Sequence, residues 1–261
     1  MIFTDQIGHT FELEFFPKRI ISVVPSQTEL LYDLGLDDEV VGITKFCIHP
    51  DNWFRNKNRI GGTKNLNLEK IAALKPDLII ANKEENTQSE IEALQKLYPV
   101  YTSDISNLED SLQMITDIGK LTNTAEKSTK IVATINVEFE QLSKHNFTKR
   151  SALYLIWKKP YMSINQTRFI HDMMQRCGLT NVIKMGLDYP EVSEKEMINL
   201  NPEFILLSSE PFPFKEKHIK EFQSICPNAR VLLVDGEYFS WYGSRLLKAP
   251  NYFIGLIEKM A

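Results

Sequence analysis

Short runs of aliphatic and β-branched residues alternate with helical patterns along most of the chain. Runs that predict buried strands occur in both halves, at residues 19–24, 40–44, 78–81, 152–156 and 231–234. Helical patterns lie between them, at residues 27–34, 68–74 and 167–177. Because strands and helices alternate at this spacing, we expect an α/β fold in which mostly parallel sheets are covered by helices on both faces.

Residues typical of helix ends accompany the first two of these helices. Ser26 and Glu29 have the spacing of a capping box, and Gly35 follows the last apolar residue of the first helix. Asn67 directly precedes the second helix. These residues predict that the first helix is capped by Ser26 and the second by Asn67.

One segment of the first half is echoed in the second. Residues 67–80 and 193–206 each contain a capping residue, a short helical pattern, a Pro-acid pair and an apolar strand, in the same register. The two copies occupy comparable points of two α/β units. The echo therefore predicts two pseudo-duplicated lobes.

The longest stretch without glycine or proline, residues 123–159, lies between the two units. Its apolar residues recur at helical spacing from Thr124 to about Lys144, which predicts a helix roughly 30 Å long at 1.5 Å per residue. We expect two Rossmann-like α/β lobes joined by one long backbone helix, with an N-terminal lobe at 1–122, the helix at 123–147 and a C-terminal lobe at 148–261. The alternative is an ordinary linker helix within one large domain.

Composition and charge argue against several classes of function. There are 11 glycines, and Gly61-Gly62 is the only adjacent pair, so neither a phosphate-binding loop nor a dinucleotide fingerprint has the residues it needs. The net charge is -4 and the 30 basic residues are scattered, which argues against nucleic acid. The three cysteines are far apart and the five histidines are dispersed, so we predict neither a disulfide framework nor a protein metal site.

Six segments of the chain resemble the helical-backbone substrate-binding proteins of ABC importers, which serve cobalamin, haem and ferric siderophores. The resemblance covers nearly the whole chain and rests on residues 19–31, 34–35, 40–44, 68–79, the long helix and 192–202. It is closest to the vitamin B12-binding branch, because of the Pro-Ser-Gln-Thr-Glu turn at 25–29 and the loop from Thr44 to Pro50. The resemblance implies that cobalamin or a related corrinoid is captured between two lobes, without covalent chemistry, and delivered to the permease.

The resemblance also implies no cofactor of the protein's own and a periplasmic or membrane-surface location. The expected partners are a cobalamin-type ligand and an ABC permease and ATPase complex, and we expect a monomer. The amino terminus lacks a basic region followed by an apolar run, and no stretch is apolar enough to span a membrane, so a truncated start or a cytoplasmic form stays open. A haem or ferric-siderophore ligand is the alternative within the same family.

The expected ligand site lies at the loops that follow the strands, since ligands of open α/β sheets bind outside the carboxyl ends of the strands. The candidate ligand-binding residues in these loops are Pro25, Ser26, Gln27, Phe46, His49, Trp157, Tyr161, Phe239, Trp241, Tyr242 and Arg245. Their aromatic rings suit a large planar macrocycle, although each ring could instead pack against a lobe. Four aromatic residues within 238–242 are not expected to point inward together, so at least one should touch ligand.

For two of these candidates, Arg245 and His49, a ligand contact and a purely structural position both stay open. Arg245, with Arg168, would pair with an anionic siderophore, and otherwise begins the final helix. His49 would approach a metal centre carried by the ligand, and otherwise is a turn residue beside proline. An enzyme on this scaffold would use Cys47 as nucleophile with His49 or His171 as base, but no recognisable motif supports it, so we do not expect an enzyme.

For docking, the resemblance implies one exposed glutamate on each lobe that pairs with arginines of the permease. Glu69 matches the first position. The second position falls on Lys195, which departs from the family pattern. We choose its neighbour Glu194, because Glu196 has capping-box spacing from Ser193.

Overall fold

The computed structural model describes residues 1–145, 147–184 and 186–260. The chain divides into two compact units, the first made of residues 1–105, 109–134 and 242–245, and the second of 106–108, 135–241 and 246–261. Each unit contains one larger parallel sheet. The division differs from the expected boundaries in three ways: residues 242–245 belong to the first unit, 106–108 belong to the second, and the expected connecting segment 123–147 is divided between the units after residue 134.

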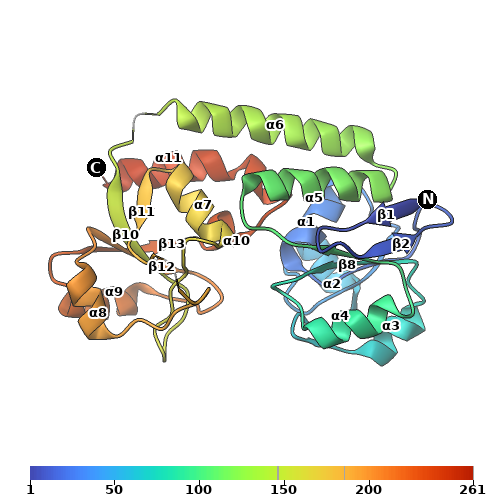
Figure 1. Cartoon of the computed structure of the whole chain (residues 1–261), viewed down its shortest axis with the longest axis horizontal. Helices are drawn as coiled ribbons and strands as arrows, with labels where there is room; N and C mark the ends of the chain where they lie inside the picture. The colour runs from blue at the N-terminus through green and yellow to red at the C-terminus, as the bar shows by residue number, and fades with distance from the viewer. Residues whose placement is uncertain (146, 185, 261) are drawn as a thin grey trace. The chain divides into compact units, whose positions relative to one another are not determined.

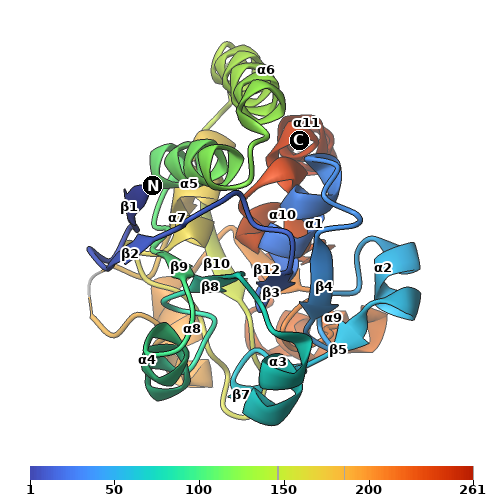
Figure 2. The same ribbon diagram turned by 90° about the vertical axis from the view of Figure 1, so that its right-hand side faces the viewer.

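The sheet of the first unit has five parallel strands. Their order is β5 (Asn58–Arg59), β4 (Val40–Ile43), β3 (Ile20–Ser22), β8 (Leu78–Asn82) and β9 (Val100–Ser103). The helices are α1 (Pro25–Asp33), α2 (Asp51–Asn56), α3 (Leu68–Leu74), α4 (Gln88–Gln95) and α5 (Leu108–Leu121). Figure 2 shows α3 and α4 on one side of this sheet and α1 and α5 on the other.

Two short antiparallel pairs complete the first unit. They are β1 (Ile2–Thr4) with β2 (Thr10–Glu12), and β6 (Gly61–Gly62) with β7 (Asn65–Leu66). Gly61 has a φ of +110°, and a Cβ there would lie 2.5 Å from the carbonyl oxygen of Asn65. The tight turn between these strands therefore requires glycine at this position.

The second unit has a four-stranded parallel sheet. Its strand order is β11 (Leu179–Asn181), β10 (Arg150–Leu155), β12 (Phe204–Ser208) and β13 (Arg230–Val234). Its helices are α7 (Phe169–Arg176), α8 (Glu194–Leu200), α9 (Glu216–Ile225), α10 (Glu237–Ser240) and α11 (Ala249–Met260), with a 3₁₀ helix at Ser244–Leu247. Figure 1 shows α8 and α9 on one side of this sheet and α7 and α11 on the other.

Alternate residues of the second sheet enter two separate apolar layers. Leu153 and Leu155 of β10 pack in one buried cluster with Met197 of α8 and Phe222 of α9. Tyr154, between them, points to the opposite face and lies 5.2 Å from Phe239, measured between ring centroids. Both faces of a parallel strand are therefore buried, which explains the continuous apolar run in the sequence.

The long helix α6 (Ala125–Ser143) begins in the first unit and ends in the second. It lies where the apolar spacing predicts a helix. Ile135, Phe139 and Leu142 are buried, whereas Val137 is half exposed. The helix therefore buries a stripe of side chains at a spacing of three and four residues.

The two helix-start predictions have different outcomes. Asn67 caps α3, and its side chain accepts a hydrogen bond from the backbone N–H of Lys70 at 2.9 Å. The prediction for α1 is wrong, because the helix begins at Pro25, after Val24, and Ser26 is a buried residue of its first turn. Proline has no N–H to leave unpaired and its φ already suits a first helical position.

The echo between residues 67–80 and 193–206 is confirmed in three dimensions. Lys75 and Asn201 end the helices α3 and α8 in the left-handed conformation, with φ of 44° and 42°. Asp77 then accepts from the backbone N–H of Arg19 at 2.8 Å, and Glu203 accepts from that of Ser151 at 2.8 Å. In each unit the acid after proline thus fixes the entry of the neighbouring parallel strand.

Candidate functional site

The loops at the carboxyl ends of the first sheet are joined by buried amide and hydroxyl groups. Gln27 is fully buried in α1 and its Nε2 donates to Ser103 Oγ at the end of β9. Asn82, at the end of β8, donates from Nδ2 to the same Ser103 Oγ at 3.0 Å. Gln27 Oε1 has no hydrogen-bond partner among the described residues. The candidate Gln27 therefore lies beneath the loops as part of their support.

The loop after β8 is fixed by two buried asparagines. Asn82 Oδ1 accepts from the backbone N–H groups of Glu84 and Glu85, at 2.9 Å each, and Asn86 Oδ1 accepts from Asn82 N at 2.8 Å. Asn86 Nδ2 donates to the carbonyl of Thr63 at 3.0 Å. Sequence reasoning placed this loop at the site but missed the network, because hydrogen bonds between distant loops leave no periodic pattern.

Cys47 belongs to a second buried group in the same unit. Its Sγ lies 3.1 Å from Thr28 Oγ1 and 3.1 Å from Thr44 Oγ1, and the residue is fully buried. Burial raises the pKa of the thiol. A thiol held neutral is a poor nucleophile, so the environment of Cys47 is that of a structural residue.

Phe46 presents the exposed aromatic ring of this edge. The side chain is 51% exposed, and Lys45 Nζ lies 5.0 Å from the ring centroid. A Cβ at Gly62 would lie 3.1 Å from the ring, so the ring rests directly on the glycine backbone. His49, three residues further, is half-buried. The two candidates therefore lie at the surface, as a ligand contact would require.

Arg245 forms a two-point ion pair within the first unit. Its Nη2 lies 2.9 Å from Glu29 Oε1 and its Nε donates to Glu29 Oε2 at 2.9 Å. Burial raises the pKa of Glu29, and the guanidinium opposes that shift. Arg245 lies in the 3₁₀ helix at Ser244–Leu247, before the final helix. The pair neutralises the charge that an anionic siderophore would need.

The aromatic segment 238–242 corrects the sequence interpretation. Phe239 has no exposed surface, so the prediction that it contacts ligand is wrong, and its neighbours Trp241 and Tyr242 are 6% exposed each. Tyr238 is stacked on Tyr252, with centroids 4.4 Å apart. The segment is not one loop: 237–240 form α10 in the second unit, and Tyr242 belongs to the first. Three of the four rings are therefore buried, and Tyr238 is half-buried.

In the second unit, Trp157 is the exposed ring at the end of β10. It is 40% exposed and meets Phe212 edge-on, with centroids 5.9 Å apart. Phe212 also contacts Phe214, at 4.7 Å, and His218, at 5.6 Å. The sequence interpretation missed Phe212, which lies in a different strand-end loop. These rings hold Trp157 at the surface.

The same loop is fixed by an ionic contact. Glu221 of α9 accepts hydrogen bonds from Lys158 Nζ and, at 2.7 Å, from the hydroxyl of Tyr161. Burial opposes the charge of Glu221, but these two hydrogen bonds outweigh it and lower the pKa. Tyr161 also packs edge-on against Phe222, at 5.1 Å. Both the ring and the hydroxyl of this candidate therefore support the loop.

Glu210 is a half-buried residue near the end of β12. Burial raises its pKa, and the charges of Glu237 and Asp235 act in the same direction. Hydrogen bonds from Ser240, at 2.6 Å, and Trp241 oppose the shift. The candidate Trp241 is thus engaged with this carboxylate.

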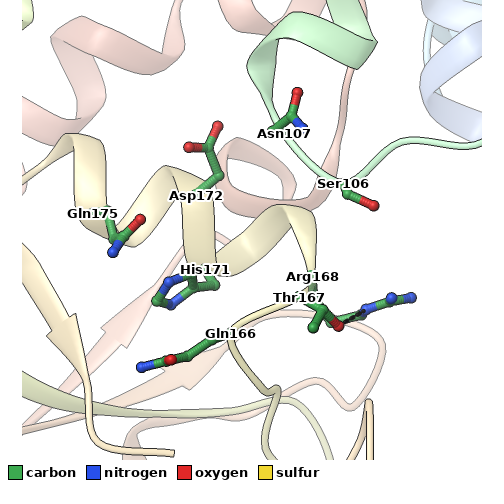
Figure 3. Close-up of a pocket in the computed structure, with 8 residues that line it drawn as sticks. All are labelled: Ser106, Asn107, Gln166, Thr167, Arg168, His171, Asp172 and Gln175. Atoms are coloured by element: carbon green, nitrogen blue, oxygen red, sulfur yellow. Dashed lines mark hydrogen bonds between the residues drawn. The ribbon is translucent and has the colours of Figure 1, made fainter. Parts of the chain in front are cut away.

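A polar pocket of about 420 Å³ lies at the start of α7, in the second unit (Figure 3). Its wall carries hydroxyl, carboxamide and charged side chains from the segment before α5, from the loop between β10 and α7, and from α7 itself. Gln166 lies in the loop between β10 and α7, and His171 and Gln175 lie in α7. The sequence interpretation named His171 only as a base for the enzyme alternative, and it did not single out Gln166 or Gln175.

The two docking candidates occupy the first turns of matching helices. Glu69 is exposed in α3 and Glu194 is exposed as the first residue of α8. Ser193 and Glu196 form the expected capping box, with Glu196 Oε2 accepting from Ser193 N at 2.7 Å. Glu196 is therefore committed to its own helix, whereas Glu194, which is also exposed, takes no part in the capping box.

Two parallel α/β units, a shared long helix and exposed rings at strand ends are the features of a binding protein. Residues 20–224 match the family described as Periplasmic binding protein, and the chain belongs to this family. Among the described residues, no helix is both long and apolar enough to cross a bilayer, and no cluster of His, Cys, Asp and Glu is arranged to hold a metal ion.

Named relatives refine this comparison. A vitamin B12-binding protein of Vibrio campbellii is 28% identical over 195 residues, which cover 73% of this chain and 70% of the relative. The crystal structure of the periplasmic vitamin B12 binding protein BtuF of Vibrio cholerae has a TM-score of 0.81 at 23% identity, covering 94% of this chain and 98% of that one. A periplasmic haem-binding protein from Pseudomonas aeruginosa has a TM-score of 0.81 at 17% identity, covering 94% of each chain. Both solved structures share the fold.

Proposed function

We propose that this chain is the substrate-binding protein of an ABC importer, and that it captures cobalamin or a related corrinoid at its strand-end loops. The observation that carries the proposal is the pair of exposed rings, Phe46 in the first unit and Trp157 in the second, each at the carboxyl end of a parallel sheet. Rings of this kind offer apolar faces to a macrocycle. Family membership and relatives named for vitamin B12 binding support the choice.

Charge favours a corrinoid over the alternatives, haem and ferric siderophores. Haem carries carboxylates, and many siderophores are anionic, so both call for cations that are free to pair. Arg245 faces Glu29 at 2.9 Å, and Arg168 faces Asp188 at 3.5 Å. Cobalamin presents neutral carboxamides instead. The haem-binding neighbour shares only the fold with this chain, and haem is the second candidate.

The proposed cellular role is delivery of the corrinoid, outside the cytoplasm, to a permease and ATPase complex, by a monomer without catalytic activity. Its ligand would be bound reversibly. Burial and a raised thiol pKa at Cys47 support a binding role over Cys-based catalysis. The absence of turnover can be checked directly, since cyanocobalamin recovered from the complex should be chemically unchanged.

A ligand panel tests the proposal. The purified chain is titrated with cyanocobalamin, haemin and a ferric siderophore, and binding is followed by calorimetry. We expect saturable binding of cyanocobalamin and at least tenfold weaker binding of the other two, because the arginines are already paired. Saturable binding of haemin with none of cyanocobalamin would replace the corrinoid by the second candidate.

Glu69 and Glu194 are the proposed docking residues. Both are exposed carboxylates at the starts of echoed helices, so they are placed for rim contacts with arginines of a permease. Glu69→Lys should reduce transport into permease-containing vesicles by about tenfold while leaving the corrinoid Kd unchanged. Glu92→Lys, on α4 of the same unit, is the matched control. Full transport by the Glu69→Lys protein would remove this residue from the docking surface.

A further inference from the structure

The pocket at the start of α7 is polar but balanced in charge. Asp172 Oδ2 accepts from the backbone N–H of Leu108 and from Arg176 Nε, at 2.8 Å each. The Nη2 of Arg168 faces Asp188 at 3.5 Å. Because each charged group of the wall already faces an opposite charge or a donor, the pocket favours a neutral polar group over an ion.

His171 contributes a buried ring nitrogen whose hydrogen bonding is unsatisfied among the described residues. The residue is 7% exposed, and its Nδ1 has no hydrogen bond within the part of the chain that the structure describes. Burial lowers the pKa of the ring, which keeps the imidazole neutral. A neutral ring presents Nδ1 either as a donor or as an acceptor. A carboxamide satisfies both cases, because it carries an N–H donor and a carbonyl acceptor.

Two carboxamides extend this wall. Gln166 and Gln175 are exposed, and within the described ranges neither side chain makes a hydrogen bond. In Figure 3 the ring of His171 is drawn with Gln166 and Gln175 along one side of the pocket, while Ser106 and Asn107 come from the segment ahead of α5. Amide groups pair with other amides by reciprocal donation and acceptance, so this wall is complementary to a carboxamide.

The pocket also has the right position within its unit. Gln166 belongs to the connection from β10 to α7, and therefore lies on the carboxyl side of the second sheet. Trp157 begins the same connection. A macrocycle that stacks on the ring of Trp157 could thus extend a side arm along this loop.

We propose that this pocket is a hydrogen-bonding subsite for a neutral, carboxamide-bearing arm of the corrinoid, with His171 as its buried anchor and Gln166 and Gln175 as its rim. The inference rests on the proposed function and deepens it: the pocket distinguishes amide-fringed corrinoids from carboxylate-bearing macrocycles. These three side chains recognise the arm through hydrogen bonds between neutral groups.

Calorimetric Kd values for cyanocobalamin test the subsite. His171→Leu and Gln166→Leu should each weaken binding by about tenfold, since each removes a hydrogen-bonding group. Gln141→Leu, an exposed glutamine of α6 in the same unit, is the control and should bind as the unmodified protein does. Gln166 is exposed, so its variant leaves the core intact even if His171→Leu perturbs α7.

A second experiment changes the ligand instead of the protein. In the monocarboxylic acid isomers of cyanocobalamin one peripheral carboxamide is a carboxylate. At least one isomer should bind the unmodified protein about tenfold more weakly than cyanocobalamin, and Gln166→Leu should abolish that difference. Equal affinity of the unmodified protein and both variants for cyanocobalamin would overturn the subsite and leave the proposed function standing. Absence of any corrinoid binding by the unmodified protein would overturn the proposed function, and the subsite with it.

Discussion

The strand-end loops of the two units have the same position on similar sheets but are held by different interactions. In the first unit, buried amides such as Asn82 and Asn86 bind the backbone of the loops. In the second, Phe212 and its neighbouring rings support Trp157, and Glu221 fixes the loop from the side. The supporting segments α3–β8 and α8–β12 are, by contrast, closely matched. The two units therefore share the scaffold and differ at the edge that we assign to the ligand.

Removing one amide from the first unit should have the largest effect on stability. Asn82→Ala deletes the acceptor for two backbone N–H groups and the donor to Ser103, in a side chain that is 2% exposed. We expect the free energy of unfolding to fall by about 3 kcal/mol, measured by urea denaturation. Asn56→Ala, at the exposed end of α2, is the control. A loss no larger than the control's would show that the network contributes little.

Removing the exposed rings should affect binding more than folding. Trp157→Ala should raise the corrinoid Kd roughly thirtyfold, and Phe46→Ala about tenfold, because the indole offers the larger apolar face. The free energy of unfolding should change by less than about 1 kcal/mol, since both rings are partly exposed. Phe15→Ala removes an exposed ring outside the strand-end loops and should leave the Kd unchanged. Similar losses in all three variants would contradict the assignment.

The smallest expected effect is a difference in pH dependence within the second unit. Burial raises the pKa of Glu210, so its ionisation costs stability as pH rises above about 4.3, the pKa of an unfolded glutamate. Glu210→Gln should therefore stabilise the protein at pH 7, with the gain shrinking toward pH 4.

For Glu203 we expect the opposite pH dependence of stability. The backbone N–H of Ser151 lowers its pKa, so its contribution to stability is present above about pH 4.3 and is lost as pH falls through the lowered value. Glu203→Gln should therefore destabilise the protein at pH 7. Thermal melts of both variants between pH 3.5 and 7.5 measure the two trends, and parallel trends would contradict the stated causes.

Local patterns predicted α3 and α6 because the interactions that define a single helix are local. Asn67 caps α3 through a bond three residues away, and the spacing of Ile135, Phe139 and Leu142 is a property of a single helix. The family resemblance supplied the class of protein, which the family match supports.

The details of the site depended on contacts that sequence spacing does not encode. Phe239 and Tyr242 are three residues apart, yet they belong to different units, so the count of aromatic residues in the segment misled. Phe212 reaches Trp157 from another strand-end loop, and the role that we propose for His171 depends on a pocket wall drawn from three segments. Only the tertiary structure brings these groups together.

The most direct test of the central claim is isothermal titration of the unmodified chain with cyanocobalamin. We predict one corrinoid bound per chain with a Kd of about 1 μM or tighter, and recovery of the ligand unchanged after the complex is denatured. No heat of binding at ligand concentrations up to roughly 1 mM, in a protein that shows a cooperative thermal transition, would contradict the account.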